Sequence, residues 1–190
     1  MAPLTKPASG HGTLRVFVCV FAAFACACTT KEQPVGVVSA SITPTGRPVA
    51  VSVVPNSGSG ASQIFEITFS HPGGYKQLSD VRLLINAEAD GSHACYIYYS
   101  LSTDSFMLVN DSGEGSKSAI LSGGASLENS QCRVLTKGAA VKGDGADISV
   151  TIPVHFKSQF AGTKKLILYA ETSGGARTDL LQKGSYEATN

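Results

Sequence analysis

The chain has 190 residues, with 15 lysines and arginines against 14 aspartates and glutamates, and its formal net charge is +1. The charged side chains stand singly along the sequence, which excludes the basic patch of a nucleic-acid-binding protein and a polybasic membrane-binding segment. The part that follows the leader and linker described below has roughly 140 residues, the size of one ordinary domain.

The first predicted element is a secretory leader over residues 1–28. It contains Lys6 and Arg15 but no acidic residue, and every residue from Val16 to Cys28 is apolar. A basic start, a short apolar run and small residues at its end are typical of a signal peptide. The run is shorter than the about 20 residues that a transmembrane helix needs. We therefore expect an exported protein, either in the cell envelope or secreted.

The end of the leader, AAFACAC, leaves two kinds of processing open. Its alanines satisfy the small-x-small rule for ordinary signal cleavage, which discards the cysteines as apolar filler or leaves unpaired thiols. The segment also resembles a lipoprotein box, with Ala25 where leucine is usual, and Cys28 is then the lipidation site and the membrane anchor. When Cys28 is acylated, only Cys95 and Cys132 remain to pair, and we expect these two to form a disulfide.

Residues 29–47 are predicted to be a tether. The segment is rich in Ser, Thr and Pro and has few large apolar side chains. Such a composition buries too little surface to offset the conformational entropy lost on ordering. One folded domain is expected after it, over residues 48–188.

From Pro48 onward, short runs of alternating apolar and polar residues are separated by Gly, Ser, Asn and Asp, which predicts β-strands. The run at 64–70 places Phe65, Ile67 and Phe69 on one face, and the run at 81–86 places Val81, Leu83 and Ile85 inward. The other expected strands are VAVSVV, ACYIYYSL, FMLVND, SQCRVL, DISVTIPVHF, KKLILYAE and QKGSYE. Helical spacing is absent after the leader, so an all-β sandwich or barrel is predicted.

Several segments of this domain carry a resemblance: VSVVPNSGSGASQIFEITFSHPGGYKQLSDVRLLIN, ACYIYY, FMLVND, NSQCRV and FAGTKKLILYA. They resemble an immunoglobulin-like module found in large exported proteins of environmental bacteria, often in tandem or beside catalytic domains. The resemblance covers roughly residues 48–187. It implies an immunoglobulin-like or fibronectin-III-like sandwich of about seven to nine strands with a structural or accessory role, and it supplies no catalytic residues.

Residue types suited to catalysis or metal binding are scattered. His71 and His93 fall in turns and His155 on the outward side of a strand, without the short spacing of a zinc motif, so solvated histidines are favoured. Gly-x-Ser-x-Gly, which presents a hydrolase nucleophile, is absent. We expect no enzymatic activity, no metal and no cofactor.

The segment CYIYY is the one pattern suited to binding. Alternation sends Cys95, Ile97 and Tyr99 to one face and Tyr96 and Tyr98 to the other, where an exposed pair of rings would stack on a sugar or a protein. Cross-strand packing under a neighbouring loop is the favoured alternative. The expected function is a non-catalytic structural or protein-interaction module, with carbohydrate binding through the tyrosine face as the alternative.

Overall fold

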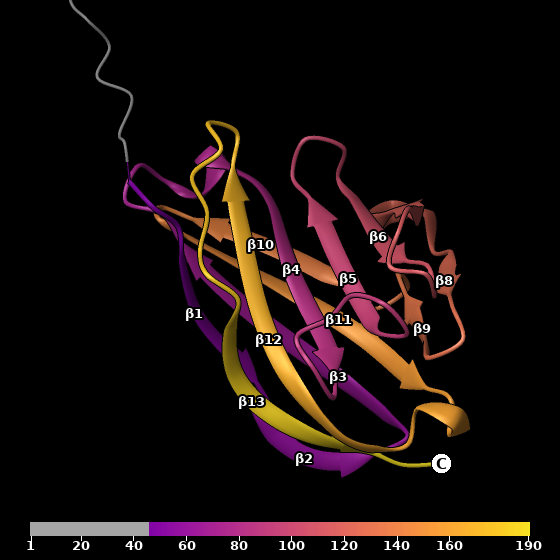
Figure 1. The fold of residues 1–190 in the computed structure, drawn as a ribbon. Coiled ribbons are helices and arrows are strands. Elements are labelled where there is room, and N and C mark those ends of the chain that lie inside the picture. Colours follow the sequence, from indigo (N-terminus) through magenta and orange to yellow (C-terminus); the bar gives the residue numbers. More distant parts are fainter. Residues whose placement is uncertain (1–45) are drawn as a thin grey trace, which may run out of the picture. The chain divides into compact units, whose positions relative to one another are not determined.

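The computed structural model describes residues 46–190; the leader, Cys28 and nearly all of the tether lie outside the described residues. Within them, thirteen strands form two sheets that pack face to face (Figure 1). The all-β, sandwich-like architecture is therefore confirmed, but the strands outnumber the seven to nine that were expected. No helix in this part of the chain has the length and apolar character needed to cross a membrane.

Sheet A lies around the long central pair β3 and β11. Its spatial order is β1 (Val49–Val54), β3 (Ser62–Ser70), β11 (Asp147–Phe156), β9 (Cys132–Leu135) and β8 (Ser126–Glu128), with β10 (Ala140–Asp144) also paired to β11. All of these pairings are antiparallel.

Sheet B has a continuous order of strands. It runs β2 (Ser57–Gly60), β13 (Leu181–Ala188), β12 (Gly162–Thr172), β4 (Leu78–Asn86), β5 (Cys95–Ser100), β6 (Ser105–Val109) and β7 (Ser116–Ile120). Only the β2–β13 pairing is parallel. Short 3-10 turns occur at η1 (Tyr75–Gln77), η2 (Leu121–Gly123) and η3 (Ser158–Phe160).

The hydrophobic core is formed by the alternating residues of the long strands. Phe65, Ile67 and Phe69 of β3 are fully buried, as are the inward residues of β4 and β5. β-branched and aromatic residues at every second position suit a pleated surface with one buried face, which explains why these segments form strands. The alternation read from the sequence is confirmed here.

The predicted disulfide between Cys95 and Cys132 is present and joins β5 of sheet B to β9 of sheet A. The two Cα atoms are 5.7 Å apart, and both residues are completely buried. A buried disulfide between sheets fits an oxidising, exported environment.

The buried side chain of Asn129 braces the chain beside this disulfide. Its Nδ2 donates to the carbonyl oxygens of Ala94 at 2.8 Å and Val109 at 3.0 Å, both at the ends of sheet B strands. Its Oδ1 accepts from the backbone N–H groups of Gln131 and Cys132, each at 2.9 Å. The amide group is thus fully used, as a buried polar group requires.

His71 differs from the expectation of a solvated histidine, because it is only 1% exposed. The N–H of Gly73 donates to Nδ1 at 3.0 Å, so Nε2 carries the proton and donates to the carbonyl oxygen of Gly46 at 2.8 Å. Next to Gly46, the guanidinium of Arg47 donates twice to the carbonyl oxygen of Arg177, at 3.1 and 2.9 Å. His71 can be buried in this turn because both of its ring nitrogens have a backbone hydrogen-bond partner in place of water.

Candidate functional site

The outer face of sheet B carries one row of side chains in register across four strands. Met107 of β6 lies opposite Tyr98 of β5, Tyr98 opposite Arg82 of β4, and Arg82 opposite Tyr169 of β12. These residues alternate with fully or nearly fully buried neighbours on each strand, so the pleat directs all four away from the core. We call Met107, Tyr98, Arg82 and Tyr169 the Arg82 row.

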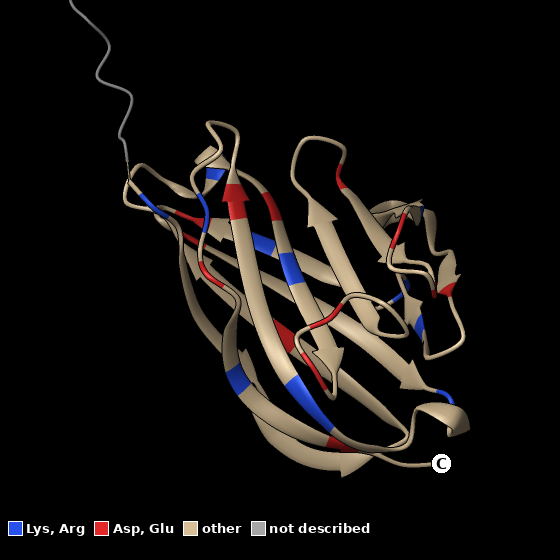
Figure 2. Cartoon of the chain, in the orientation of Figure 1, with Lys and Arg blue, Asp and Glu red and all other residues tan. Residues whose placement is uncertain are grey.

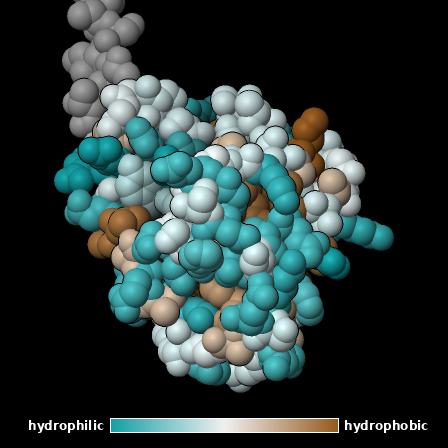
Figure 3. All heavy atoms as spheres, turned by 45° about the vertical axis from the view of Figure 1, so that its right-hand side comes forward, coloured by the Kyte–Doolittle hydropathy of each residue, from teal (hydrophilic) through white to brown (hydrophobic). Residues whose placement is uncertain are grey.

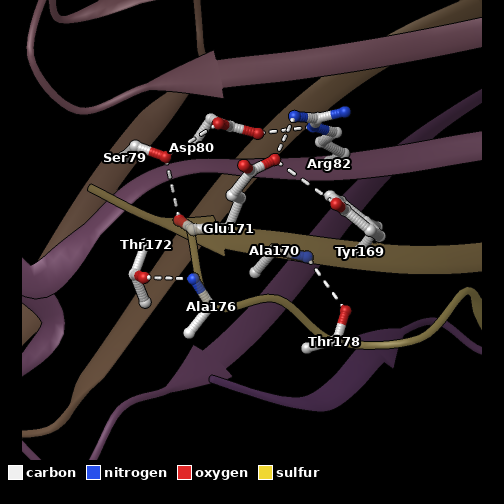
Figure 4. Close-up of polar contacts among 9 residues, drawn as sticks. All are labelled: Ser79, Asp80, Arg82, Tyr169, Ala170, Glu171, Thr172, Ala176 and Thr178. Carbon is white, nitrogen blue, oxygen red and sulfur yellow. Dashed lines mark hydrogen bonds and ion pairs between the residues drawn. The ribbon is translucent and has the colours of Figure 1, made fainter. Parts of the chain in front are cut away.

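Arg82 is held between two aromatic rings and two carboxylates. Its guanidinium carbon lies 4.3 Å from the ring centroid of Tyr98 and 4.6 Å from that of Tyr169, within the range of cation–π attraction. Nε donates to Asp80, and Nη2 lies 3.3 Å from Oε2 of Glu171 (Figure 4). Only 19% of the Arg82 side chain is exposed, and these contacts restrict its conformation.

The electrostatic balance at this position keeps the guanidinium charged. Burial is the largest single effect and opposes the charge of Arg82, but the hydrogen bond to Asp80 and the attraction of the other neighbouring groups together outweigh it, so the pKa of Arg82 is raised above its ordinary value. Burial also raises the pKa of Tyr98, whose phenol therefore stays protonated. The row thus presents a fixed cation and neutral aromatic rings.

The two carboxylates are themselves positioned by neighbouring hydroxyl groups (Figure 4). Ser79 Oγ lies 2.9 Å from Oδ2 of Asp80 and 3.0 Å from the carbonyl oxygen of Glu171. The hydroxyl of Tyr169 donates to Oε2 of Glu171 at 3.3 Å. This network connects β4 to β12 and limits the conformations open to Arg82.

The turn after β12 is closed by two threonines that are also drawn in Figure 4. The backbone N–H of Ala176 donates to Oγ1 of Thr172 at 3.0 Å. The N–H of Ala170 donates to Oγ1 of Thr178 at 3.1 Å. Both threonines are buried, so their hydroxyl groups hold the segment that follows β12 against that strand.

Tyr96 and Tyr98 lie on the outer face, yet neither ring stands free. The two rings meet edge to face with centroids 4.7 Å apart, and both residues are half-buried. Gly91, in the connection between β4 and β5, lies against Tyr96 so closely that a Cβ there would be 3.1 Å from Cδ1 of the ring. Tyr96 also packs on the buried residues Leu84 and Ile167 of the outer face. This contact pattern agrees with packing under a neighbouring loop.

The predicted histidines do not converge. His155 is exposed and its Nδ1 lies 2.7 Å from Oγ of Ser62 on the neighbouring strand, and His93 is exposed in a turn. Over residues 46–190, no group of three or more His, Cys, Asp or Glu is arranged to hold a metal ion. Acidic and basic residues are interspersed over the strands and loops drawn in Figure 2.

The sequence reasoning missed Arg82 and Tyr169. A signal for Arg82 existed, because a charged residue between two inward residues of the run VRLLIN must face outward. Tyr169 stands in the same relation to its neighbours in KKLILYAE. Their meeting with Tyr98 depends on the order β5–β4–β12, which local periodicity does not contain.

Comparisons of the chain with protein-family models, curated proteins and solved structures gave no match.

Proposed function

We propose that this chain is an exported, membrane-tethered, non-catalytic protein-interaction module, and that its partner binds the outer face of sheet B at the Arg82 row. The observation that carries this proposal is the composition of the row. Tyrosine, arginine and methionine are the residue types enriched where proteins bind one another, and tyrosine and arginine dominate binding energy there. Here all three types meet in one register line.

The row also supports the proposal through its rigidity. Arg82 is already placed by Asp80, Glu171 and two rings, so a partner does not have to order this long side chain. Ordering a flexible side chain on binding costs about 0.5–1.5 kcal/mol, and pre-ordering avoids this cost. A partner with a carboxylate or a carbonyl oxygen would find guanidinium N–H groups in a fixed orientation.

The contacts of the tyrosines favour a protein partner over a glycan. A sugar ring stacks on the open face of an aromatic ring, but the guanidinium of Arg82 lies over the Tyr98 ring and over the Tyr169 ring. Tyr96 is covered in part by Gly91. What remains accessible is a mixed edge of phenol, guanidinium and thioether groups, which suits a protein surface better than a flat sugar platform.

The sandwich is, in this proposal, immunoglobulin-like, and Cys28 anchors it in a membrane. The disulfide between opposite sheets and the sequence resemblance support the first statement, and the form of the leader supports the second. A disulfide-bonded domain behind a short tether would be displayed at the membrane surface, where an interaction module meets its partners.

A site-specific photo-crosslinker tests the binding surface. The crosslinking amino acid is placed at Met107, in the row, and separately at Lys142, an exposed residue of sheet A that serves as the control. In native cells, we expect one discrete cross-linked product from position 107 and none from position 142. Added purified wild-type protein should compete for the product, whereas protein carrying Tyr169→Ala should compete poorly. Equal products from both positions, or no product from position 107, would contradict the proposal.

A further inference from the structure

A cavity of about 770 Å³ opens at one end of the sandwich, and its lining residues come from both sheets. Its floor is the end of the main hydrophobic core, where Leu78 and Ile148 are buried. Its sides are formed by Leu101, Leu121 and Val141, which pack against the core but remain partly accessible. A concave, mostly apolar space of this size is typical of a small-molecule site.

The hydrophobic part of the cavity differs from the outer surface of the domain. Hydrophobic residues on the face drawn in Figure 3 occur in small separate groups and form no broad patch. In the cavity, by contrast, aliphatic side chains from both sheets converge, with Leu78 from sheet B and Val141 and Ile148 from sheet A. A ligand bound there would cover apolar side chains at the end of the core that the chain itself leaves partly exposed.

The walls of the cavity are already fixed by contacts within the domain. The ring of Tyr75 lies on the backbone of Gly143 so closely that a Cβ at Gly143 would come within 2.3 Å of the ring. The N–H of Leu101 donates to the carbonyl oxygen of Ser79, and that of Leu121 donates to the carbonyl oxygen of Asp104, each at 3.0 Å. The cavity is therefore pre-formed, as ligand sites usually are.

One carboxylate lies at the mouth of this cavity. Oδ1 of Asp104 accepts a hydrogen bond from the hydroxyl of Tyr99 at 2.7 Å, whereas Oδ2 accepts none from the described part of the chain. Burial, and then this bond, raise the pKa of Tyr99, so its phenol remains a donor. Ser79 Oγ directs its proton toward Asp80 and Glu171, which leaves its lone pairs free to accept. The acceptors available to a ligand are thus Oδ2 of Asp104 and Oγ of Ser79, beside the hydroxyl groups of Tyr75, Ser102 and Ser173, which can donate or accept.

We propose that this cavity binds a small apolar molecule that carries one ammonium group, with the apolar part on the aliphatic floor and the ammonium at Asp104. An ammonium group has three donors and no acceptor, which matches the carboxylate of Asp104, whose Oδ2 is available to accept. The rings of Tyr75 and Tyr99, which also line the cavity, add cation–π attraction. Lys76 is the one cation of the lining; like Asp104 it is exposed, so solvent and salt screen both charges.

Phenethylamine is a suitable probe, with phenylacetate as its anionic counterpart of similar size. Titration of the exported full chain, followed by NMR shifts and calorimetry, should show saturable phenethylamine binding with Kd of about 1 mM, as expected for a fragment. The shifts should centre on the amides of Leu101, Asp104 and Leu121. Phenylacetate should bind at least about tenfold more weakly, because it places a charge of the same sign beside Asp104. No saturable amine binding, or equal binding of the acid, would overturn the proposal.

Variants separate the charge from the shape of the site. Asp104→Asn preserves the shape and suits the positive φ of 46° at this residue, and it should weaken amine binding about tenfold or more. Leu121→Trp, at a partly exposed position, should block the cavity with the larger side chain. It provides a second test if Asp104→Asn fails to fold. Lys76→Ala should leave amine affinity unchanged or tighten it. Undiminished binding by Asp104→Asn or by Leu121→Trp, or a loss of affinity in Lys76→Ala, would refute the assignment.

Discussion

Replacing Arg82 with methionine tests the network that positions the outer face of sheet B. The variant keeps an apolar stem between the rings of Tyr98 and Tyr169 but leaves Asp80 and Glu171 without their shared cation. Removing one partner of a buried charge pair costs about 3–5 kcal/mol. The two carboxylates retain side-chain exposures of 17% and 30%, so water screens part of the loss and we expect a decrease of about 2–3 kcal/mol in the free energy of unfolding.

Urea denaturation at neutral pH measures this loss, with the slope of the transition unchanged if the native fold persists. Arg133→Met is the matched control: Arg133 pairs with Glu128 at 3.0 Å, but its side chain is 48% exposed, so its loss should cost under about 1 kcal/mol. Equal losses in the two variants would refute the view that Arg82 is the centre of a semi-buried network.

Three further outcomes are expected. Replacing both Cys95 and Cys132 with serine should lower the free energy of unfolding by about 4 kcal/mol, since the disulfide closes a long loop; unchanged stability in non-reducing urea denaturation would contradict this. The double change Tyr96→Ala/Tyr98→Ala should lower the free energy of unfolding by about 2–4 kcal/mol, because the half-buried rings pack on each other. An unaltered melting temperature combined with lost glycan binding would favour the carbohydrate alternative. Labelled fatty acid should enter the wild-type protein in exporting cells but not Cys28→Ser, and an unlabelled wild-type product would exclude the anchor.

The central strands were predictable from the sequence, whereas several edge strands were not. The inward faces of β3, β4 and β11 are buried, so apolar residues recur there at every second position and reveal both the strand and its orientation. β2, β7 and β8 read SGSG, SKSAI and SLE and are largely exposed. Such strands are held by backbone pairing at sheet edges, and side-chain periodicity does not record that pairing.

β10 is a different case, since its sequence contains a hairpin signal that periodicity alone overlooks. β10 ends at Asp144, and Gly145 and Ala146 form the two-residue loop to β11, in which Gly145 takes a positive φ of 55°. A glycine at the first position of a two-residue loop, before a clearly alternating run, is typical of such a hairpin. The turn chemistry, more than the polar residues of β10 itself, identifies the strand.

Only part of the candidate site was predictable from the sequence, again because local patterns do not contain the order of the strands. The outward direction of Tyr96 and Tyr98 follows from a period of two, which is a local property. The stacking of Arg82 between Tyr98 and Tyr169 requires β4 to lie between β5 and β12, and β12 comes much later in the chain. The role of Asn129 was hidden for the same reason, because its side chain donates to carbonyl groups at the ends of two strands that are distant in sequence. Non-local strand order decides both arrangements.

The attachment of the chain at Gly46 and Arg47 has a mechanical consequence. A pulling force on the chain before the domain reaches Gly46 and Arg47 before it reaches β1. Gly46 is hydrogen-bonded to the His71 side chain, and Arg47 is hydrogen-bonded to the segment after β12. β1 in turn is paired antiparallel with β3 along its length, so a load along its axis shears several perpendicular hydrogen bonds together. Force applied at the N-terminal end of the domain is therefore shared between both sheets from the start, and β1 is protected from being peeled away one bond at a time.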